Sequence, residues 1–356
     1  MITFVLGTRP EIIKLSPLLA LVQARNIPFR LIHTGQHYSP DMDTVFFDEL
    51  HLPQPHVNLG VGSGSHGKQT GIMLEKLEAL FLEQKPSVVV VQGDTNSVLA
   101  GALAAAKLHI PVAHVEAGLR SFDKNMPEEL NRIMTDHIST YLFAPTENAQ
   151  ELLLREHFPE EQIYVVGNTV VDAVERNKMF ASHSPVLQQL GVGSKSYGLV
   201  TLHRPENVDD KEILLGMIEG LKQVAELLQM PLLWPIHPRT KSRLEQFGIV
   251  LPASLRLLDP QPYLAFLKLS SEAKLILTDS GGIQEEACIL NVPCVTLRTS
   301  TERPETLETG SNILAGVEPS DIVAAVKEIL AKPLGWENPF GDGKASERIL
   351  EILERV

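Results

Sequence analysis

Cysteine, positive charge and long apolar runs are all scarce in this chain of 356 residues. Its two cysteines, Cys288 and Cys294, have the spacing of neither a CxxC redox pair nor a zinc site, which favours a reducing compartment. The formal net charge of −13 argues against a nucleic-acid groove, because such a surface needs a basic stripe to neutralise phosphates. The composition therefore predicts a protein with no nucleic-acid partner.

Segments suited to a membrane or to a targeting signal are also missing. No apolar run approaches the roughly 18 residues of a membrane span. The apolar start of the chain breaks after Leu6, which is too early for a signal peptide. No repeat with a period of about 20 to 50 residues occurs. We therefore expect a cytoplasmic protein that has no membrane partner.

Short apolar runs alternate with segments of helical periodicity from end to end. In the first half, the runs predicted to be strands are 2–6, 29–33, 87–91, 112–115, 141–144 and 163–166. In the second half they are 197–202, 231–236, 254–258, 274–278, 293–297 and 312–315. This alternation predicts parallel sheets covered by helices on both faces. We therefore predict an α/β fold with two Rossmann-like domains that face a cleft.

The length of the chain exceeds that of one typical core and predicts two domains. The joint is expected in "VGNTVVD" (166–172), where a strand ends in glycine before a new helix begins. The chain is expected to cross between the domains a second time near 336–353, where a stretch with Pro and Gly precedes a final helical pattern. We assign 1–168 to an N-terminal domain, onto which 341–356 packs back, and 169–340 to a C-terminal domain.

The stretch "TDSGGIQEEA" (278–287) joins the end of a predicted strand to the start of a helix. A helix N-terminus carries unpaired N–H groups and partial positive charge, so Gly281 and Gly282 would let a phosphate approach the backbone. Glu286, one turn further on, could accept hydrogen bonds from ribose hydroxyls. This interpretation predicts a nucleotide. The alternative is a helix capped by Ser280, with glycines chosen for packing.

Polar clusters follow several other predicted strands. They are "GTRPE" (7–11), "QGDTNS" (92–97), "EAGLRS" (116–121) and "HRPEN" (203–207). In open α/β sheets, ligands bind outside the carboxyl ends of the strands. The ligand site is therefore expected at these strand ends, in a cleft between the two domains.

Three carboxylates and one histidine are the candidates for acid–base chemistry. Asp94, Glu116 and Glu128 belong to the first domain, and His203 belongs to the second. Clustered carboxylates shift each other's pKa values, as an acid or base that works near neutrality requires. The same carboxylates could bind magnesium. Arg132 is a possible partner of these acids, and its i, i+4 spacing from Glu128 is also that of an ordinary helix surface pair.

Several other motifs have two interpretations each. Arg9 and Lys14 suit a diphosphate or form a solvated surface pair. "GSGSHGKQT" (62–70) fits G-x-x-x-x-G-K, but Gln69 stands where a P-loop needs Ser or Thr, so we predict a flexible glycine loop that lines the cleft. The spacing of Phe266 predicts a core position, and contact of its ring with a base is the alternative. No G-x-G-x-x-G follows a strand, which argues against a nicotinamide cofactor.

Seven motifs, in this order, resemble those of the non-hydrolysing UDP-N-acetylglucosamine 2-epimerases. They are "GTRPEIIKLSPL", "QGDTNS", "HVEAGLRS", "MPEELNR", "TLHRPEN", "LTDSGGIQEEA" and "TERPET". The resemblance spans nearly the whole chain. The segment "TGQHYSPDMDTVFF" (34–47) is similar to the archaeal and thermophile branch of that family.

The resemblance implies a glycosyltransferase-B-like fold with a UDP-binding C-terminal domain, a homodimer, and no metal or other cofactor. It implies reversible epimerisation of UDP-N-acetylglucosamine to UDP-N-acetylmannosamine at C2, by elimination and re-addition of UDP through a 2-acetamidoglucal intermediate. The alternatives are a 2-epimerase of UDP-2,3-diacetamido-glucuronic acid and a hydrolysing enzyme that releases N-acetylmannosamine and UDP. Many bacterial members differ at 37–43, where they bind an activating second substrate molecule, so substrate activation stays open.

The resemblance also implies roles for individual residues. Asp94, Glu116 and Glu128 match the catalytic acids, without indicating which abstracts the proton, and His203 matches a residue near the diphosphate. The matching substrate-binding residues are Arg9, Lys14, Arg132, Gln261, Phe266, Ser280, Gly281, Gly282, Glu286 and Arg303. Within this set, Gln261 and Phe266 match the uridine region, Ser280 to Gly282 the diphosphate cradle, and Glu286 the ribose contact.

Overall fold

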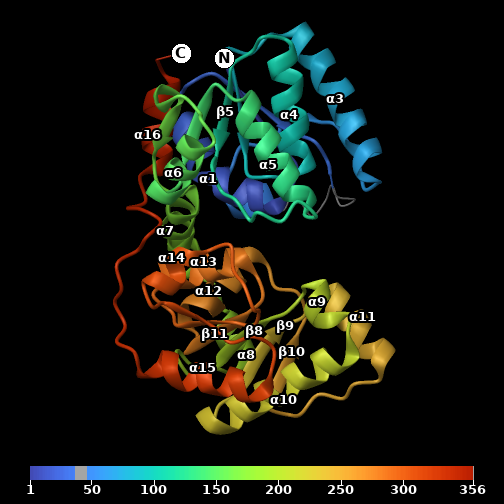
Figure 1. Cartoon of the computed structure of the whole chain (residues 1–356), viewed down its shortest axis with the longest axis vertical. Coiled ribbons are helices and arrows are strands. Elements are labelled where there is room, and N and C mark those ends of the chain that lie inside the picture. The colour runs from blue at the N-terminus through green and yellow to red at the C-terminus, as the bar shows by residue number, and fades with distance from the viewer. Residues whose placement is uncertain (37–45, 356) are drawn as a thin grey trace. The chain divides into compact units, whose positions relative to one another are not determined.

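The computed structural model describes residues 1–36 and 46–355 and divides into two compact units (Figure 1). Unit 1 contains Met1–Glu175 and Phe340–Val356, and unit 2 contains Arg176–Pro339. Helix α7 (Thr169–Ala181) begins at the predicted joint and runs from one unit into the other. The segment 37–43, on which the question of substrate activation depends, lies outside the described residues.

Unit 1 is built on a seven-stranded parallel sheet with the order β3-β2-β1-β4-β5-β6-β7. Its strands are β1 (Ile2–Leu6), β2 (Phe29–His33), β3 (Val57–Asn58), β4 (Val88–Gln92), β5 (Val112–Val115), β6 (Tyr141–Ala144) and β7 (Ile163–Val165). Each strand predicted in this part of the chain is present. The unpredicted β3 has only two residues and is not fully buried, so it lacks the apolar run that marks the others.

Helices cover both faces of this sheet. Besides α7, unit 1 contains α1 (Arg9–Ala24), α3 (His66–Glu83), α4 (Asn96–Lys107), α5 (Pro127–Ile138), α6 (Glu147–Arg155), a short 3₁₀ turn (Glu160–Gln162) and α16 (Ala345–Leu353). Helix α4 lies between α3 and α5, and the C-terminal α16 packs against α1 (Figure 1). Asp172 accepts hydrogen bonds from the backbone N–H groups of Ala345 and Ser346. This contact caps α16 and fixes the end of the chain on unit 1.

The flexible glycine loop predicted for 62–70 is wrong from His66 onward. Ser65 is extended and α3 begins immediately after it, so this stretch includes the first turn of a helix. Gln69 is buried, and its side-chain amide donates to the carbonyl oxygens of Gly62 at 2.9 Å and Gln36 at 3.1 Å. Gln69, which stands where a P-loop needs Ser or Thr, therefore connects the start of α3 to the preceding segments by hydrogen bonds.

Unit 2 repeats the plan with a six-stranded parallel sheet in the order β10-β9-β8-β11-β12-β13. Its strands are β8 (Gly198–Thr201), β9 (Leu232–Pro235), β10 (Leu255–Leu258), β11 (Leu275–Thr278), β12 (Cys294–Thr296) and β13 (Asn312–Leu314). Each was predicted. Its helices, after the end of α7, are α8 (Val186–Leu190), α9 (Pro205–Val208), α10 (Lys211–Leu228), α11 (Pro238–Phe247), α12 (Tyr263–Glu272), α13 (Gly281–Ile289), α14 (Pro304–Glu308) and α15 (Pro319–Ala331). Helices α10 and α15 lie side by side, and Trp234 of β9 is buried in one core cluster with residues of both helices.

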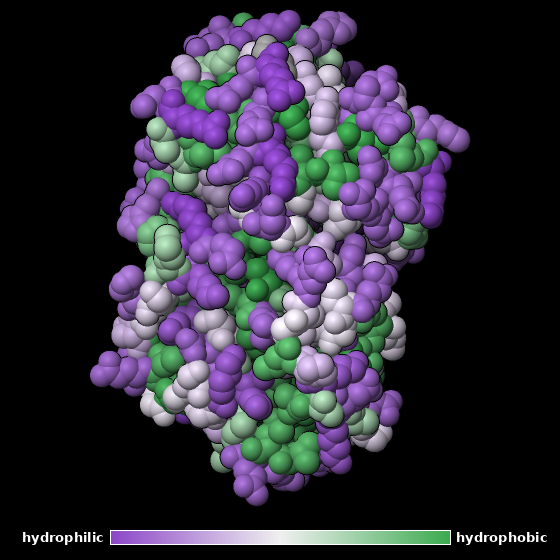
Figure 2. Space-filling view, turned by 90° about the vertical axis from the view of Figure 1, so that its left-hand side faces the viewer, coloured by the Kyte–Doolittle hydropathy of each residue, from purple (hydrophilic) through white to green (hydrophobic). Residues whose placement is uncertain are grey.

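Hydrophobic residues form several groups among hydrophilic ones on the face drawn in Figure 2, and a larger group lies toward the lower end of that view. Within residues 1–36 and 46–355, every helix is too short or too polar to cross a lipid bilayer.

Candidate active site at the strand ends

Each sheet has a topological switch point, where the strand order reverses. In unit 1 it lies between β1 and β4, and in unit 2 between β8 and β11. Ligands of open α/β sheets bind outside the carboxyl ends of the strands at such points. Asp94 follows β4, Glu116 follows the neighbouring β5, and His203 and Ser280 follow β8 and β11. In each unit, the predicted residues therefore lie where the topology would bind a ligand.

Glu116 is held in one orientation by two side chains. Lys14 Nζ donates to its two carboxylate oxygens at 2.7 and 2.8 Å, and the side-chain amide of Gln92 donates to Oε2. Glu116 is 8% exposed and has a φ of +73°, a left-handed conformation that costs a non-glycine residue energy. Lys14 is therefore not a solvated surface cation. The role of Gln92 was not predicted. The only sign of it in the sequence is a polar side chain at the end of an apolar strand.

Asp94 belongs to a separate group centred on Arg132. One guanidinium nitrogen of Arg132 binds the Asp94 carboxylate, and another binds Glu129 Oε2 at 2.8 Å. Asn131 donates to the carbonyl oxygen of Asp94 at 3.0 Å. The ion pair predicted between Glu128 and Arg132 is thus replaced by an i, i+3 pair with Glu129. Among the described residues, no three His, Cys, Asp or Glu side chains come together as metal ligands would.

The adjacent residues Glu128 and Glu129 have opposite environments. Glu128 is exposed in the first turn of α5, whereas Glu129 is 1% exposed. Burial alone would raise the pKa of Glu129, but hydrogen bonds from the N–H groups of Ser121 and Phe122, together with Arg132, outweigh it and lower that pKa. Glu129 therefore fixes the loop before α5, a role that sequence analysis missed, and Glu128 is left accessible.

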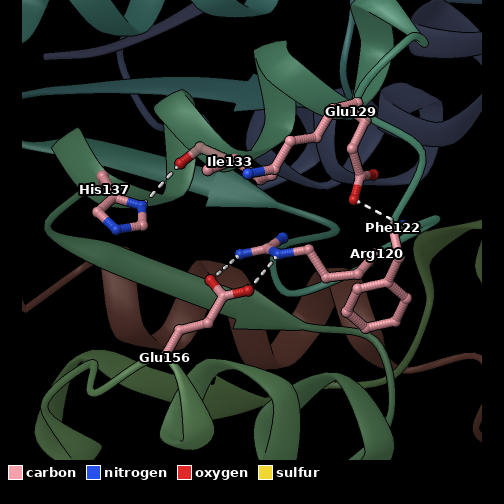
Figure 3. Close-up of a pocket in the computed structure, with 7 residues that line it drawn as sticks. Arg120, Phe122, Glu129, Ile133, His137 and Glu156 are labelled. Carbon is pink, nitrogen blue, oxygen red and sulfur yellow. Dashed lines mark hydrogen bonds and ion pairs between the residues drawn. The ribbon is translucent and has the colours of Figure 1, made fainter.

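A hollow of about 360 Å³ lies beside this loop (Figure 3). The residues that line it are Arg120, Phe122, Lys124, Glu129, Ile133, His137 and Glu156. Arg120 forms a two-pronged ion pair with Glu156 at 2.8 and 2.6 Å, as Figure 3 shows. None of the residues predicted to bind or transform substrate lines this hollow, so it is distinct from the candidate site.

Glu11 joins the loops that follow β1 and β4. Its carboxylate accepts hydrogen bonds from the backbone N–H of Gly7 at 2.6 Å and from the hydroxyls of Thr8 at 3.0 Å and Thr95 at 2.6 Å. The side chain is buried, and burial raises its pKa from 4.5 to about 7 although the three hydrogen bonds oppose the shift. The role of Glu11 was not predicted, because Thr95 lies 84 residues away in the sequence.

This pKa makes the free energy of unfolding depend on pH. The unfolded chain ionises Glu11 at its ordinary pKa, below that of the folded state, so stability falls as pH rises from about 4.5 to about 7. A difference of one pKa unit corresponds to about 1.36 kcal/mol. Between pH 5 and pH 8, the free energy of unfolding of the wild type should therefore fall by about 2 to 3 kcal/mol relative to that of Glu11→Gln. Urea unfolding of both proteins at the two pH values measures this. A stability difference that does not change with pH would contradict the prediction.

In unit 2, Asp279 organises the segment that begins with His203. Its buried carboxylate accepts hydrogen bonds from the backbone N–H groups of His203 and Arg204, each at 2.9 Å, and from Asn207 Nδ2 at 3.2 Å. It also faces His203 Nδ1 at 3.0 Å. Burial would raise the pKa of Asp279, but the hydrogen bonds and the nearby His203 outweigh it and lower that pKa. With Nδ1 directed at Asp279, Nε2 is the ring nitrogen that remains for a ligand.

The turn into α13 is open. Ser280 occupies the N-cap position, but its side chain makes no capping hydrogen bond. A Cβ atom on Gly282 would meet no described atom within 4 Å, and one on Gly281 would lie 3.7 Å from Glu302 Oε2. The alternative of a Ser280-capped helix with glycines chosen for packing is therefore wrong. The Ser280 N–H donates to Thr278 Oγ1 at 2.9 Å, and the N–H groups of Gly281 and Gly282 at the helix start suit an anion.

Three other residues predicted to bind the nucleotide, Arg303, Glu286 and Gln261, also belong to unit 2. Arg303 Nε is 2.8 Å from Oε1 of the buried Glu285, and Glu286 is half-buried on the same helix as Glu285. The side-chain amide of Gln261 donates to the carbonyl oxygen of Asp259 before α12.

Phe266 and Arg9 are the remaining predicted ligand contacts. Phe266 is half-buried and is not among the buried hydrophobic residues, so it is more exposed than the core position that its spacing predicted. In unit 1, the exposed Arg9 lies over the ring of Phe46, with 5.7 Å between its guanidinium carbon and the ring centroid.

Two parallel sheets, each wrapped by helices and each with polar groups at its switch point, define a Rossmann-like α/β protein of the glycosyltransferase-B-like class. A sequence profile described as UDP-N-acetylglucosamine 2-epimerase matches residues 19–354. The chain is 54% identical to the UDP-N-acetylglucosamine 2-epimerase of Methanocaldococcus jannaschii, over 99% of this chain and 98% of the relative. It therefore belongs to the UDP-N-acetylglucosamine 2-epimerase family.

Solved structures agree with this assignment. The crystal structure of the M. jannaschii UDP-GlcNAc 2-epimerase in complex with UDP-GlcNAc and UDP matches with a TM-score of 0.91, covering 100% of this chain and 99% of that one. The Neisseria meningitidis enzyme bound to UDP-GlcNAc is 32% identical, has a TM-score of 0.90 and is covered completely. Another relative, the UDP-2,3-diacetamido-2,3-dideoxy-D-glucuronate 2-epimerase of Pseudomonas aeruginosa, is 40% identical over 99% of each chain.

Proposed function

We propose that this protein interconverts UDP-N-acetylglucosamine and UDP-N-acetylmannosamine at C2 without net hydrolysis. The observation that carries the proposal is the Glu116 carboxylate, held by Lys14 and Gln92 at the strand ends of unit 1. The M. jannaschii relative, which is bound to UDP-GlcNAc and UDP, supports the choice of substrate. No protein group in this proposal needs a metal or a redox cofactor.

The chemistry follows from the weak acidity of the C2 hydrogen, which has no adjacent carbonyl group. A carboxylate takes the C2 proton, the C–H electron pair forms the C1–C2 double bond, and the C1–O bond breaks with its electrons on UDP. The product is a 2-acetamidoglucal. Protonation of C2 on the opposite face and return of the UDP oxygen to C1 give the epimer. We assign the proton transfers to Asp94, Glu116 and Glu128.

Departure of UDP requires stabilisation of the charge that develops on its diphosphate. We assign this to the N–H groups of Gly281 and Gly282 in the first turn of α13, to the hydroxyl of Ser280, whose own N–H donates to Thr278 Oγ1 at 2.9 Å, and to His203, which Asp279 orients. The further contacts proposed for the bound UDP-sugar are Glu286 with the ribose, Gln261 and Phe266 with the uracil, and Arg9, Lys14, Arg132 and Arg303 with other parts of the ligand.

Incubation with UDP-N-acetylglucosamine in deuterated water tests this function. We expect deuterium at C2 of the nucleotide sugar and accumulation of the manno epimer, both followed by NMR. If the protein binds UDP tightly but gives no epimer and no deuterium exchange even at high concentration, it is a binding protein instead. Free UDP and N-acetylmannosamine in amounts equal to the substrate lost would identify a hydrolysing enzyme.

The P. aeruginosa relative makes UDP-2,3-diacetamido-glucuronic acid the second candidate substrate. The two substrates differ in a carboxylate and an acetamido group on the sugar. Comparison of kcat/KM for both, with the same enzyme preparation, decides between them, and we expect the larger value for UDP-N-acetylglucosamine.

The adjacent residues Glu128 and Glu129 provide a matched pair of variants. Glu128→Gln should lower kcat about 10²-fold with little change in stability, because an exposed carboxylate that takes part in proton transfer is lost. Glu129→Gln should destabilise the protein by about 1–3 kcal/mol, because it weakens the hydrogen bonds to Ser121, Phe122 and Arg132. Steady-state kinetics and urea unfolding measure both. Unchanged kcat in Glu128→Gln would remove that residue from the mechanism.

We further propose that the protein is a homodimer, as its family resemblance implies. Light scattering on the purified chain should then give twice the 39.2 kDa chain mass. A particle with the mass of one chain would refute this.

A further inference from the structure

A buried histidine and a buried aspartate connect the segments that carry the proposed catalytic carboxylates. His114 on β5 and Asp136 on α5 are both fully buried, and His114 Nδ1 lies 2.6 Å from Asp136 Oδ1. His114 Nε2 lies 2.8 Å from the carbonyl oxygen of Gly93, the residue before Asp94. Asp136 Oδ2 accepts the backbone N–H of Gly118, two residues after Glu116, at 3.2 Å. One pair of side chains thus contacts both loops.

The partners of His114 determine which ring atoms carry protons. The Gly93 carbonyl can only accept, so Nε2 donates to it. Burial alone would raise the pKa of Asp136, but His114 and Arg120 outweigh it and hold that pKa below its ordinary value, so the aspartate is ionised. An ionised carboxylate can only accept, so Nδ1 also donates. This hydrogen-bond pattern therefore assigns a donor role to each ring nitrogen.

Arg120 completes the group from the other side. Its Nη1 donates to Asp136 Oδ2 at 2.7 Å, while Nε and Nη2 bind Glu156 (Figure 3). The Arg120 guanidinium therefore offsets the buried Asp136 charge, and His114 lies within hydrogen-bond distance of the same carboxylate. His114 and Asp136 are fully buried and bound to protein groups, so their influence on a reaction must act through the loops they hold.

We propose that His114 and Asp136 are a positioning pair that fixes Asp94 and Glu116 relative to each other, and thereby sets kcat but not UDP affinity. The proposal rests on the 2-epimerase function proposed above. A hydrogen bond at the residue before Asp94 and another two residues after Glu116 leave little freedom between the two carboxylates. Misplacement of a catalytic group by about 1 Å can lower a rate about 10²-fold.

Two variants test the pair, and one variant controls for general destabilisation. His114→Phe keeps an aromatic ring but cannot donate to Gly93 or Asp136, and Asp136→Asn keeps the shape but loses the charge. Leu77→Ala opens a cavity under α3, away from both loops, and lowers stability without touching the pair. For each protein, kcat and KM are measured with UDP-N-acetylglucosamine, UDP affinity by calorimetry, and melting temperature by scanning fluorimetry.

We expect kcat to fall about 10²-fold in His114→Phe and in Asp136→Asn. The UDP affinity of both variants should stay within about twofold of the wild-type value. The control Leu77→Ala should retain the wild-type kcat. The proposal is overturned if a folded variant keeps kcat within about threefold of wild type, or if UDP affinity falls as much as kcat. Absence of turnover in the wild type would instead refute the proposed function.

A measurement on the wild-type protein does not depend on the variants folding. In a nitrogen–proton correlation spectrum, His114 should show two protonated ring nitrogens with slowly exchanging protons, since both are buried and hydrogen-bonded. A single protonated nitrogen would contradict the hydrogen-bond assignment on which the positioning role depends.

Discussion

Glu116→Gln is expected to lower kcat for C2 epimerisation about 10³-fold, the middle of the range that a general acid or base contributes. The amide has nearly the shape of the carboxylate but cannot take up a proton from C2. Its oxygen can still accept from Lys14, so the protein should remain folded, with a stability loss of about 1–3 kcal/mol from the weakened pair. Steady-state kinetics in both reaction directions measure the effect.

Glu116→Asp is the matched control, because it keeps the acid and withdraws it by one methylene. Its kcat should fall about 10²-fold and thus lie between those of wild type and Glu116→Gln. Deuterium incorporation at C2 should fall in parallel with turnover in both variants. If Glu116→Gln still exchanged the C2 hydrogen at the wild-type rate, another group would be the base, and Asp94 and Glu128 would be the remaining carboxylates.

The strands could be predicted from sequence because their cause is local. A parallel strand buried on both faces is a short run of apolar residues, and β4 (Val88–Gln92), which is buried throughout, is an example. The P-loop-like stretch shows the limit of such reasoning. Its glycines suggested a loop, yet a helix begins at His66, and Gln69 in its first turn donates to the carbonyl oxygens of Gly62 and of Gln36, which is 33 residues away.

The candidate site could be predicted only as far as strand ends and family motifs reveal it. Asp94, Glu116 and Ser280 stand out since each follows an apolar run. Contacts between distant segments could not be predicted: 102 residues separate Lys14 from Glu116, and the sequence gives no sign of their pairing. For the same reason, the roles of Gln92, Glu129 and Asp279 became visible only in the structure.

Asp279→Asn is the second variant for which a large effect is expected. Asp279 orients His203 through Nδ1 and also holds the backbone N–H groups of His203 and Arg204. An asparagine has one acceptor oxygen and must turn its amide N–H groups toward at least one of these donors. If His203 assists the departure of UDP, kcat should fall about 10²-fold, with a stability loss of about 1–3 kcal/mol.

A double-mutant cycle with His203→Ala separates orientation of the histidine from an independent role of the aspartate. If Asp279 acts through His203, then once the ring is gone Asp279→Asn should lower kcat by no more than about threefold further. Asn207→Ala serves as the control, because Asn207 binds Asp279 Oδ2 without touching the ring, so it should lower stability but leave kcat near the wild-type value. Effects on kcat that multiply in the double variant would show instead that Asp279 contributes to the reaction without His203, through the backbone of the turn that both residues share.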